Sequence, residues 1–433
     1  MIVRKFLLAG ILLHTHHSAA QNWVTWRGPL QTGVATNATP PTVWSETKNI
    51  RWKTAVAGLG HATPVAWNNH LFVLSAVPFG EKFEGKPDSA PGAHDNHLVT
   101  QKHRFQVQAL SIDRGEILWT TTVREEIPRE GGHFTGSLAS NSPVTDGKYL
   151  YAFFGSRGLY AIDFDGTIQW SKDFGNMETR HAHGEGASPA LHNDTLIVNW
   201  DHEGQSFVTA LHATTGNEKW RTLRDENTSW SSPLIIEHAG RHQVIIPATK
   251  RIRSYDLADG SLIWECAGLS RNVVSTPVSD GEMVYFSNSY DWQIMMGIKL
   301  DGSKGDITKT DQVVWRIYRN TSYVPSPLLY DERLYVLGHN QGIMTIIESK
   351  TGKTIQRAFR LPDIQTVFAS PMGANGNIYV NDMDGTTLVF KHGDQPEMVS
   401  VNQLDDRFSA SPIALGKDLI LRGYKHVYCL RSE

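Results

Sequence analysis

The 433-residue chain lacks the features of a membrane-spanning, helical or disulfide-rich protein. Beyond residue 20, no apolar run reaches the roughly 18 residues that a membrane-spanning helix needs. Apolar residues do not recur at a 3.6-residue spacing over about ten positions, which argues against a helical repeat. Only Cys266 and Cys429 are present, too few for a disulfide framework. The two could pair, but each lies in or beside an apolar stretch, which favours two buried thiols.

The first twenty residues form a segment that we expect to be removed. Arg4 and Lys5 precede an apolar run over 6–13, and small residues over 18–20 offer a cleavage site. This order is typical of a secretory signal peptide, with a buried N-terminal helix as the alternative. We therefore expect residues 1–20 to be a signal peptide and the mature protein to be periplasmic or secreted. No Cys stands at the cleavage point, so we expect neither a lipid anchor nor a membrane span.

Neither nucleic-acid binding nor a common catalytic class is indicated. The formal net charge is −3, and it becomes −5 once Arg4 and Lys5 are removed. Because phosphate binding requires a basic surface, we expect no nucleic-acid partner. The chain has no Gly-x-Ser-x-Gly, phosphate-binding loop or His-Glu-x-x-His motif. Whether the protein is an enzyme stays open, and the missing motifs favour a non-enzymatic role.

The chain does contain an internal repeat. A Ser-Pro or Thr-Pro pair, an apolar stretch and a turn recur eight times, at intervals of 41 to 79 residues. The eight pairs are Thr63-Pro64, Ser142-Pro143, Ser188-Pro189, Ser232-Pro233, Thr276-Pro277, Ser326-Pro327, Ser370-Pro371 and Ser411-Pro412. Repeats of this length indicate an array of similar structural units. We expect each Pro to begin the innermost strand of its unit, where it does not interrupt a ladder.

Tryptophan marks the same units. In four of them a Trp follows a turn glycine after four residues: Gly115 and Trp119, Gly166 and Trp170, Gly216 and Trp220, Gly260 and Trp264. Trp52 and Trp315 hold the same place without the glycine, whereas Gln356 replaces the Trp of the seventh unit. Because Trp buries a large surface, one Trp per unit predicts packing between neighbouring units.

Each unit has the pattern of four short strands. In the unit over 142–170, β-branched and aromatic stretches alternate with Gly and Asp turns. Four strands in roughly 45 residues make the blade of a β-propeller. We therefore predict an all-β, eight-bladed β-propeller of four-stranded antiparallel blades over 48–433, after an N-terminal extension over 21–47. The Trp52 strand is expected to close the ring by joining the last blade, and we expect a monomer.

These units resemble the pyrroloquinoline-quinone-type (PQQ-like) propeller repeat. The resemblance rests on the Pro-Val-x-x-(Asp/Asn)-Gly start, the Leu-Tyr-Ala-Ile-Asp core at 159–163 and the Asp-Gly-x-x-x-Trp end. It covers about residues 48–431. Quinoprotein dehydrogenases with this repeat hold the quinone and a calcium ion over the ring centre. The scaffold lipoprotein of the outer-membrane barrel-assembly machinery is similar and has no cofactor.

The chain departs from both kinds of relative. The alcohol-oxidising quinoproteins typically carry an adjacent Cys pair against the quinone, whereas Cys266 and Cys429 are single and far apart. The scaffold protein is lipid-anchored, and the expected cleavage point here has no Cys. The resemblance thus implies pyrroloquinoline quinone as a cofactor, but the missing Cys pair does not support it.

Topology places a candidate ligand-binding face. Residues before each Pro motif, and loops between the second and third strands, surround one mouth of the channel, and loops on a rigid scaffold often carry function. The candidate ligand-binding residues on this face are His61, His133, His181, His183, Glu185, Asp201, His202, Trp230, Arg251, Tyr323, His339 and Arg407. A metal at these histidines is one alternative, although we assign no metal ligands. An insertion over 78–103 carries a further His pair and is expected to be a solvated loop.

Three functions fit this face. The first is a binding scaffold of the cell envelope, whose partner would be a polar small molecule, a glycan or an envelope protein. The second is a carbohydrate-active enzyme, in which Trp230, Tyr323 and Phe368 stack on a sugar. Glu185, Asp201 and the His residues would then move protons. The third is a quinone-dependent oxidoreductase. The sequence does not decide among them.

Overall fold

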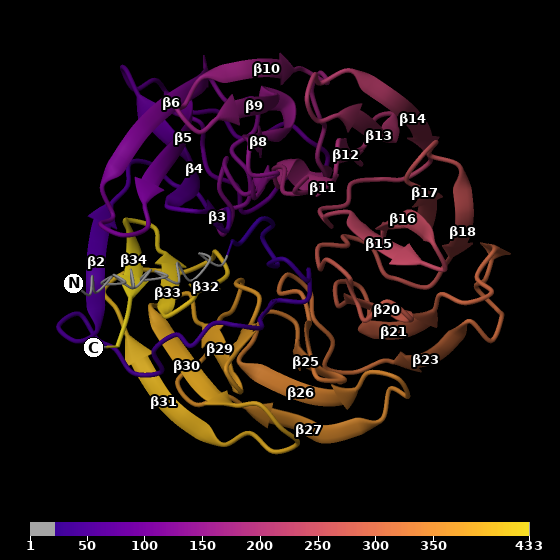
Figure 1. The fold of residues 1–433 in the computed structure, drawn as a ribbon. Coiled ribbons are helices and arrows are strands. Elements are labelled where there is room, and N and C mark those ends of the chain that lie inside the picture. The colour runs from indigo at the N-terminus through magenta and orange to yellow at the C-terminus, as the bar shows by residue number, and fades with distance from the viewer. Residues whose placement is uncertain (1–21, 433) are drawn as a thin grey trace, which may run out of the picture.

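Eight small sheets stand around a common axis in the computed structural model, which describes residues 22–432 (Figure 1). The all-β, eight-bladed propeller predicted from the repeat is confirmed. The predicted signal peptide lies outside the described residues and stays a prediction. Within 22–432, no helix has the length and apolar character needed to cross a membrane.

The first four blades are mostly antiparallel and run outward from the axis in chain order. Blade 1 contains β3 (Val65–Trp67), β4 (His70–Phe79), β5 (Lys102–Ser111) and β6 (Ile117–Glu126). Blade 2 contains β7 (Val144–Thr145), β8 (Tyr149–Phe153), β9 (Leu159–Asp163) and β10 (Ile168–Lys172). Blade 3 contains β11 (Ala190–His192), β12 (Thr195–Trp200), β13 (Ser206–His212) and β14 (Glu218–Arg224). Blade 4 contains β15 (Leu234–His238), β16 (Arg241–Ile246), β17 (Ile252–Asp256), β18 (Leu262–Cys266) and β22 (Gly305–Asp306).

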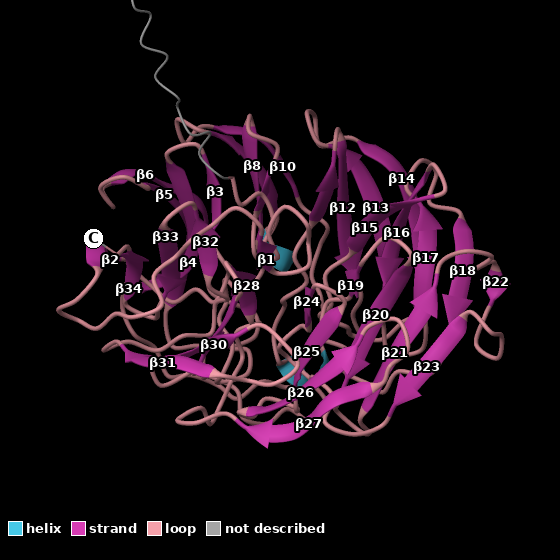
Figure 2. Cartoon of the chain, turned by 60° about the horizontal axis from the view of Figure 1, so that its bottom comes forward, coloured by secondary structure: helices cyan, strands magenta, loops and turns pink. Residues whose placement is uncertain are grey.

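The other four blades complete the ring, and two short 3-10 helices, η1 (Gly155–Arg157) and η2 (Arg180–Ala182), lie in loops (Figure 2). Blade 5 contains β19 (Val278–Ser279), β20 (Met283–Asn288), β21 (Ile294–Lys299) and β23 (Val313–Ile317). Blade 6 contains β24 (Leu328–Tyr330), β25 (Arg333–Leu337), β26 (Ile343–Glu348) and β27 (Thr354–Arg360). Blade 7 contains β28 (Met372–Ala374), β29 (Asn377–Asn381), β30 (Thr386–Lys391), β31 (Met398–Gln403) and β1 (Val34–Ala35). Blade 8 contains β32 (Ile413–Leu415), β33 (Asp418–Arg422), β34 (His426–Leu430) and β2 (Ile50–Ala55).

The Ser/Thr-Pro pairs form a closed ring at the axis, which we call the hydroxyl ring. Each innermost strand begins directly after its Pro, as predicted. In every pair the backbone N–H of the Ser or Thr donates to the hydroxyl oxygen of the next pair, at 2.8 to 3.2 Å. The last donor, Ser411, returns to Thr63. The motif therefore joins adjacent blades, in addition to starting a strand.

The repeated Trp residues join the outer parts of the blades. Each follows a one-residue bulge in the outermost strand, which turns its indole toward the next blade. Trp119 illustrates the contact: its Nε1 donates to Phe164 O at 2.7 Å, and its ring covers Gly166. Equivalent bonds start from Trp52, Trp170, Trp220 and Trp315. The predicted packing of Trp between blades is confirmed.

Trp264 makes a different bond because its neighbouring turn is longer. Residues 300–312 replace the tight turn of blade 5, and β22 in this connection adds a parallel fifth strand beside β18. Trp264 is fully buried, and its Nε1 donates to Gln243 Oε1 at 3.2 Å within its own blade. β22 thus gives blade 4 a fifth strand, and β1 does the same for blade 7. The repeat alone predicted neither of these strands.

The Trp52 strand closes the ring as predicted. β2 pairs antiparallel with β34, with Trp52 opposite Cys429, so one sheet contains both ends of the propeller. Arg51 pairs with the buried carboxylate of Asp418 at 2.9 Å and adds to the seam. Cys266 and Cys429 are both buried and unpaired, as expected.

The sequence predicted no secondary structure for the N-terminal extension. In the structure, the extension forms a strap across the axis. We use "strap" for residues 22–42, whose path across the ring centre is visible in Figure 1. Backbone or side-chain bonds join it to six blades, at Ala66, Thr145, Ile235, Leu329, Gly373 and Gly416. The Arg27 guanidinium is buried and donates to three carbonyls, those of Thr32, Pro327 and Pro371. Burial lowers the pKa of Arg27 to about 9, since no carboxylate compensates it.

The Trp–Gly contacts give a test of blade packing. Gly260 has a φ of +72°, and a Cβ there would lie 2.4 Å from the Trp220 ring. We expect Gly260→Ala to lower the free energy of unfolding by about 2–4 kcal/mol, combining backbone strain with overpacking. Gly240→Ala is the matched control, because its φ is +74° and its Cβ would meet nothing within 4 Å. Urea unfolding should show a clearly smaller loss for Gly240→Ala; equal losses would mean that the Trp contact contributes nothing.

Candidate functional site

The predicted face opens into a cavity of about 400 Å³ on the propeller axis. All eight residues of the hydroxyl ring line it, and so does Trp26 of the strap. Trp26 also lines a much smaller cavity beyond the ring, beside Pro189 and Pro233. Because Trp26 lines both spaces, it lies at the inner end of the large cavity, which we call the funnel.

The hydroxyl ring leaves hydrogen-bonding capacity toward the funnel. Each hydroxyl oxygen accepts one backbone N–H, which leaves its own O–H free to donate. Among the described residues, none of these eight O–H groups donates to a protein acceptor. The base of the funnel therefore presents a circle of polar, uncharged donors to whatever occupies it.

Aromatic side chains form much of the remaining wall. They come from the strap, from the connections before the Pro motifs and from the β20–β21 loop, and they are Trp26, Trp230, Tyr290, Tyr323 and Phe368. Trp230 is held in place because its Nε1 donates to Gly184 O at 2.7 Å. Burial raises the pKa of Tyr323 to about 12, so its hydroxyl stays protonated near neutral pH. Among the described residues no Lys or Arg lines the cavity, and the one carboxylate in the lining, Glu185, is paired with Arg157, so the funnel is close to neutral.

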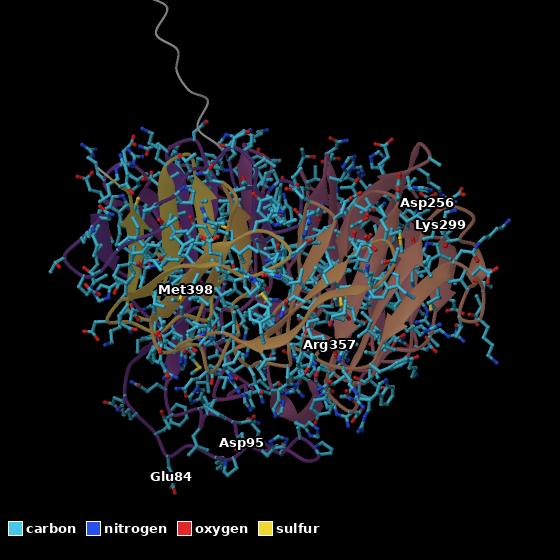
Figure 3. The ribbon with its side chains drawn as sticks, turned by 90° about the horizontal axis from the view of Figure 1, so that it is seen from below. Glu84, Asp95, Asp256, Lys299, Arg357 and Met398 are labelled. Carbon is cyan, nitrogen blue, oxygen red and sulfur yellow. The ribbon has the colours of Figure 1, made fainter. Side chains whose placement is uncertain are left out.

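The insertion of blade 1 reaches the mouth of the funnel. The prediction placed it at 78–103, but β4 and β5 extend through Pro78 and His103, which pair with each other, so the loop covers only 80–101. Figure 3 shows Glu84 and Asp95 of this loop projecting beyond the blades. The loop is bonded to the facing connections, through Asn96 to His181 O at 2.8 Å and His97 N to Gly132 O at 2.9 Å.

Four imidazoles meet where this loop touches the connections, and we call them the histidine cluster: His94, His133, His181 and His183. Ring centroids lie 5.1 Å apart for His94 and His181, 4.8 Å for His94 and His183, and 5.3 Å for His181 and His183. His133 lies 4.8 Å from His183. Three of the four were predicted, and the structure brings them together with His94.

Burial and neighbouring imidazoles lower the pKa values in the cluster. The pKa of His183 falls to about 4, through burial first and the nearby His133 and His94 second. Burial also lowers the pKa of His133, although Asp95 acts in the opposite direction. Both rings are therefore neutral near pH 7.

His61 lies beside the connection that carries His133, because its backbone N–H donates to Ser137 Oγ at 3.0 Å. Its ring packs against Tyr424 with centroids 4.7 Å apart. Burial, together with the charges of Arg422 and Arg407, lowers the pKa of His61 to about 3. The buried Nε2 has no hydrogen-bond partner among the described residues. His61 is thus a neutral group with one unused polar atom.

Glu185 lines the funnel, but its carboxylate is engaged on the blade 2 side. Its oxygens accept from Ser156 N at 2.5 Å and Ser156 Oγ at 2.6 Å, and they pair with Arg157 at 3.2 Å. Within residues 22–432, Glu185 is the only carboxylate in the lining. The described funnel thus offers no carboxylate free of an ion pair for general acid–base catalysis.

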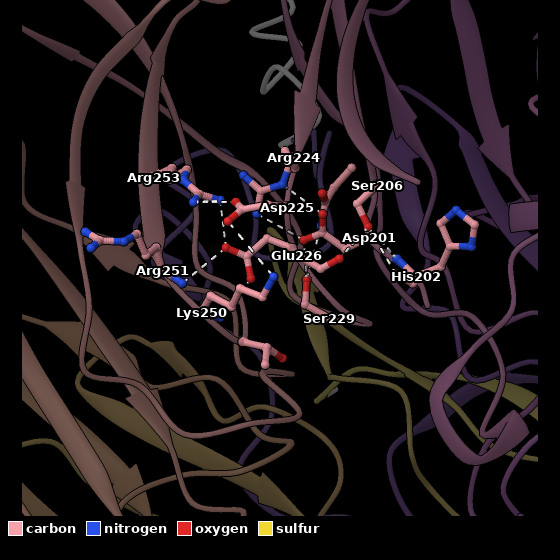
Figure 4. A network of polar contacts seen from close by, with 12 residues as sticks. Asp201, His202, Ser206, Arg224, Asp225, Glu226, Ser229, Lys250, Arg251 and Arg253 are labelled. Carbon is pink, nitrogen blue, oxygen red and sulfur yellow. Dashed lines mark hydrogen bonds and ion pairs between the residues drawn. The ribbon is translucent and has the colours of Figure 1, made fainter. Parts of the chain in front are cut away.

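Asp201 and His202, also predicted for this face, belong to a buried polar network between blades 3 and 4 (Figure 4). Asp201 forms a two-point ion pair with Arg224, at 2.8 and 3.0 Å, and both side chains are fully buried. His202 Nδ1 accepts from the backbone of Glu178. Neither residue lines the funnel.

The remaining predicted residues are divided between the rim and the outside. His339 stacks on Tyr323 with centroids 5.1 Å apart and so supports the wall. Arg407 lies over the Tyr424 ring at 5.0 Å without lining the cavity. The Arg251 guanidinium pairs with Glu265 and Asp306 at the outer edge of blade 4, and its backbone N–H donates to Glu226, the contact drawn in Figure 4. His61, His133, His183, Glu185, Trp230 and Tyr323 are the predicted residues that line the funnel.

Several lining residues were not predicted, although some had a visible signal. The hydroxyl ring was present in the repeat itself, since every Pro motif begins with Ser or Thr. Tyr290 and His94 lie in loops already placed on this face. Trp26 had no such signal, because nothing in the chain indicates that the extension returns to the axis.

The quinone and calcium ion that the resemblance implies do not fit this funnel. Calcium takes six to eight oxygen ligands with carboxylates among them, and the single lining carboxylate, Glu185, is already paired with Arg157. Pyrroloquinoline quinone is a polyanion, but no cationic side chain lines the described cavity. Cys266 and Cys429 are buried in β18 and β34, outside the lining.

Comparisons with known proteins agree with this fold. The structure of BamB from Moraxella catarrhalis is 16% identical, with a TM-score of 0.54, and covers 83% of this chain and 100% of its own. Quinohemoprotein alcohol dehydrogenase from Comamonas testosteroni is 11% identical, with a TM-score of 0.63, and covers 96% of this chain and 81% of its own. A europium-containing methanol dehydrogenase is also 11% identical, with a TM-score of 0.62 and coverage of 94% and 90%. At these identities the likeness concerns the fold alone.

Sequence comparison gives the family. No curated protein sequence matches the chain. The family model described as outer membrane protein assembly factor BamB matches residues 103–358 and 204–430, which together span more than half of the chain. The chain therefore belongs to this family of PQQ-like β-propellers.

Proposed function

We propose that this protein is a binding propeller of the cell envelope that takes a small, neutral, polyhydroxylated ligand, such as a mono- or disaccharide, into its axial funnel. The observation that supports this most is the combination of eight uncharged hydroxyls with five aromatic side chains around about 400 Å³. Similarity to the barrel-assembly factor and to quinoproteins favours the envelope location.

Sugars match this lining chemically. Their C–H faces pack on aromatic rings, and their hydroxyls exchange hydrogen bonds with side-chain hydroxyls. A charged ligand would lose its hydration in the funnel without gaining a counter-charge. A binding role is also supported over a carbohydrate-active enzyme, because Glu185 is already paired with Arg157.

The test is calorimetric titration of the purified protein with a panel of neutral mono- and disaccharides. For a sugar that binds, we expect Trp230→Ala to weaken affinity roughly tenfold or more, because each 1.4 kcal/mol of lost contact is tenfold. Trp292→Ala is the matched control, since Trp292 is 51% exposed and lies outside the lining. Its affinity should equal that of the unchanged protein.

Two other arms decide between the alternatives. Pyrroloquinoline quinone with calcium should not bind, and tight binding with dye reduction would replace this proposal by an oxidoreductase. A different outcome is that no sugar binds and that an envelope protein binds Trp230→Ala and the unchanged protein with the same affinity. In that case the funnel is not the binding site. An envelope-protein partner and the monomeric state remain predictions.

A further inference from the structure

The histidine cluster at the rim of the funnel has the layout of a metal site. A tetrahedral ion bound to imidazole nitrogens at about 2.0–2.1 Å places the ring centroids about 5 Å apart. His94, His181 and His183 have all three mutual centroid distances between 4.8 and 5.3 Å. His133, at 4.8 Å from His183, supplies a fourth ring beside this triangle.

The outward ring nitrogens are held as they are around bound metals. A metal-ligating His usually gives its second nitrogen to a carboxylate or a backbone carbonyl, which fixes the ring and its tautomer. His94 Nδ1 lies 3.0 Å from the Asp95 carboxylate, His181 Nδ1 lies 3.3 Å from Pro91 O, and His183 Nε2 lies 3.3 Å from His94 O. His133 differs, because its Nδ1 accepts the backbone N–H of Thr135 at 3.3 Å and lies 2.7 Å from the Thr135 hydroxyl, so this ring must change tautomer before its Nε2 can bind an ion.

The second ring nitrogens of His94 and His183 have lone pairs to offer. His94 Nε2, His133 Nε2 and His183 Nδ1 make no hydrogen bond within the described residues. His181 Nε2 accepts from Arg180 Nε at 3.2 Å, a bond that an incoming ion would displace. His94 is about half exposed, so an ion can reach the cluster from solvent.

We propose that the cluster binds one divalent transition-metal ion of the zinc type, through His94, His181 and His183, with His133 as an available fourth ligand. Within 22–432, no three His, Cys, Asp or Glu side chains already stand as a metal-holding group. The ring nitrogens therefore do not yet converge on one point, and binding requires the imidazoles to rotate about their side-chain bonds while their second-nitrogen contacts adjust.

The ion would join the loop over 80–101 to the connection that carries η2. His94 belongs to that loop, and His181 and His183 belong to the connection beside the funnel. At present only backbone bonds and a few side-chain bonds hold the loop there. Metal binding would thus fix the loop at the mouth, whether or not a sugar is the ligand.

The test is titration of the untagged protein with Zn²⁺ by calorimetry and with Co²⁺ by visible absorption. We expect one ion per chain, a tetrahedral cobalt spectrum and slower tryptic cleavage at the exposed Lys82. His183→Ala should abolish all three. Asp95→Asn keeps every ligand and should weaken binding about 10- to 100-fold.

The chain provides a matched control. His192 and His242 form another histidine pair, with ring centroids 4.1 Å apart, and no third ring is near them in the described residues. His192→Ala should bind metal as the unchanged protein does. Absence of stoichiometric binding, or equal losses in His183→Ala and His192→Ala, would overturn the proposal. Because no sugar is present, failure here leaves the proposed function untouched.

Discussion

Replacing Arg224 with methionine is expected to lower the free energy of unfolding by about 3–5 kcal/mol, because it leaves a carboxylate buried without a partner. Arg224 and Asp201 are both fully buried and pair at 2.8 and 3.0 Å. Arg224 also donates to Tyr255 at 2.7 Å, and Ser229 donates to Asp201 at 2.7 Å. Burial alone would lower the pKa of Arg224, but Asp201 and Tyr255 raise it above its usual value.

Two further variants identify the cause of the loss in urea unfolding. The double variant Arg224→Met with Asp201→Leu should recover much of the stability, since replacing a whole buried pair is often nearly neutral. Arg221→Met removes an exposed pair with Glu218 and should change the free energy by less than about 1 kcal/mol. If the double variant is no more stable than Arg224→Met, packing and not the unpaired charge explains the effect.

The repeat made the architecture predictable because each blade is a local unit. Four strands, a bulge and a Trp are encoded within about 45 residues, so the same pattern appears many times in one chain. The place of Trp52 in the missing outer strand then indicated ring closure, and β2 confirms it. The longer turn over 300–312 changed the bond of Trp264, a local exception that the Trp spacing could not show.

The site was predictable only to the level of a face. Topology placed the loops correctly, but side-chain direction depends on partners far apart in sequence. Asp201 turns into the blade because Arg224 and Ser229 meet it there. Trp26 reaches the axis because Arg27 is held by carbonyls of blades 6 and 7, some 300 residues away or more. No periodic pattern encodes such contacts.

Among the Trp contacts between blades, the Trp52 contact at the seam, where β2 joins β34, should matter most for keeping the ring closed. Trp52 is 8% exposed, its Nε1 donates to Ile112 O at 2.8 Å, and its ring covers Gly115. We expect Trp52→Ala to lower the free energy of unfolding by about 3–5 kcal/mol, as for other buried Trp residues. Trp220→Ala is the matched control, because Trp220 is 9% exposed and makes the same bond between blades 3 and 4.

The two variants should differ in where they open. Blades 3 and 4 are connected by continuous chain, so loss of the Trp220 contact leaves them tethered. β2 and β34 are about 370 residues apart in sequence, so pairing them closes a loop that contains the whole ring. When they separate, the chain regains the conformational entropy that this closure cost, a quantity that grows only slowly with loop length. Amide hydrogen exchange should therefore rise in β34 for Trp52→Ala and stay low there for Trp220→Ala. Equal protection of β34 in both variants would mean that the Trp52 strand is an ordinary blade contact and that the hydroxyl ring and the strap keep the propeller closed.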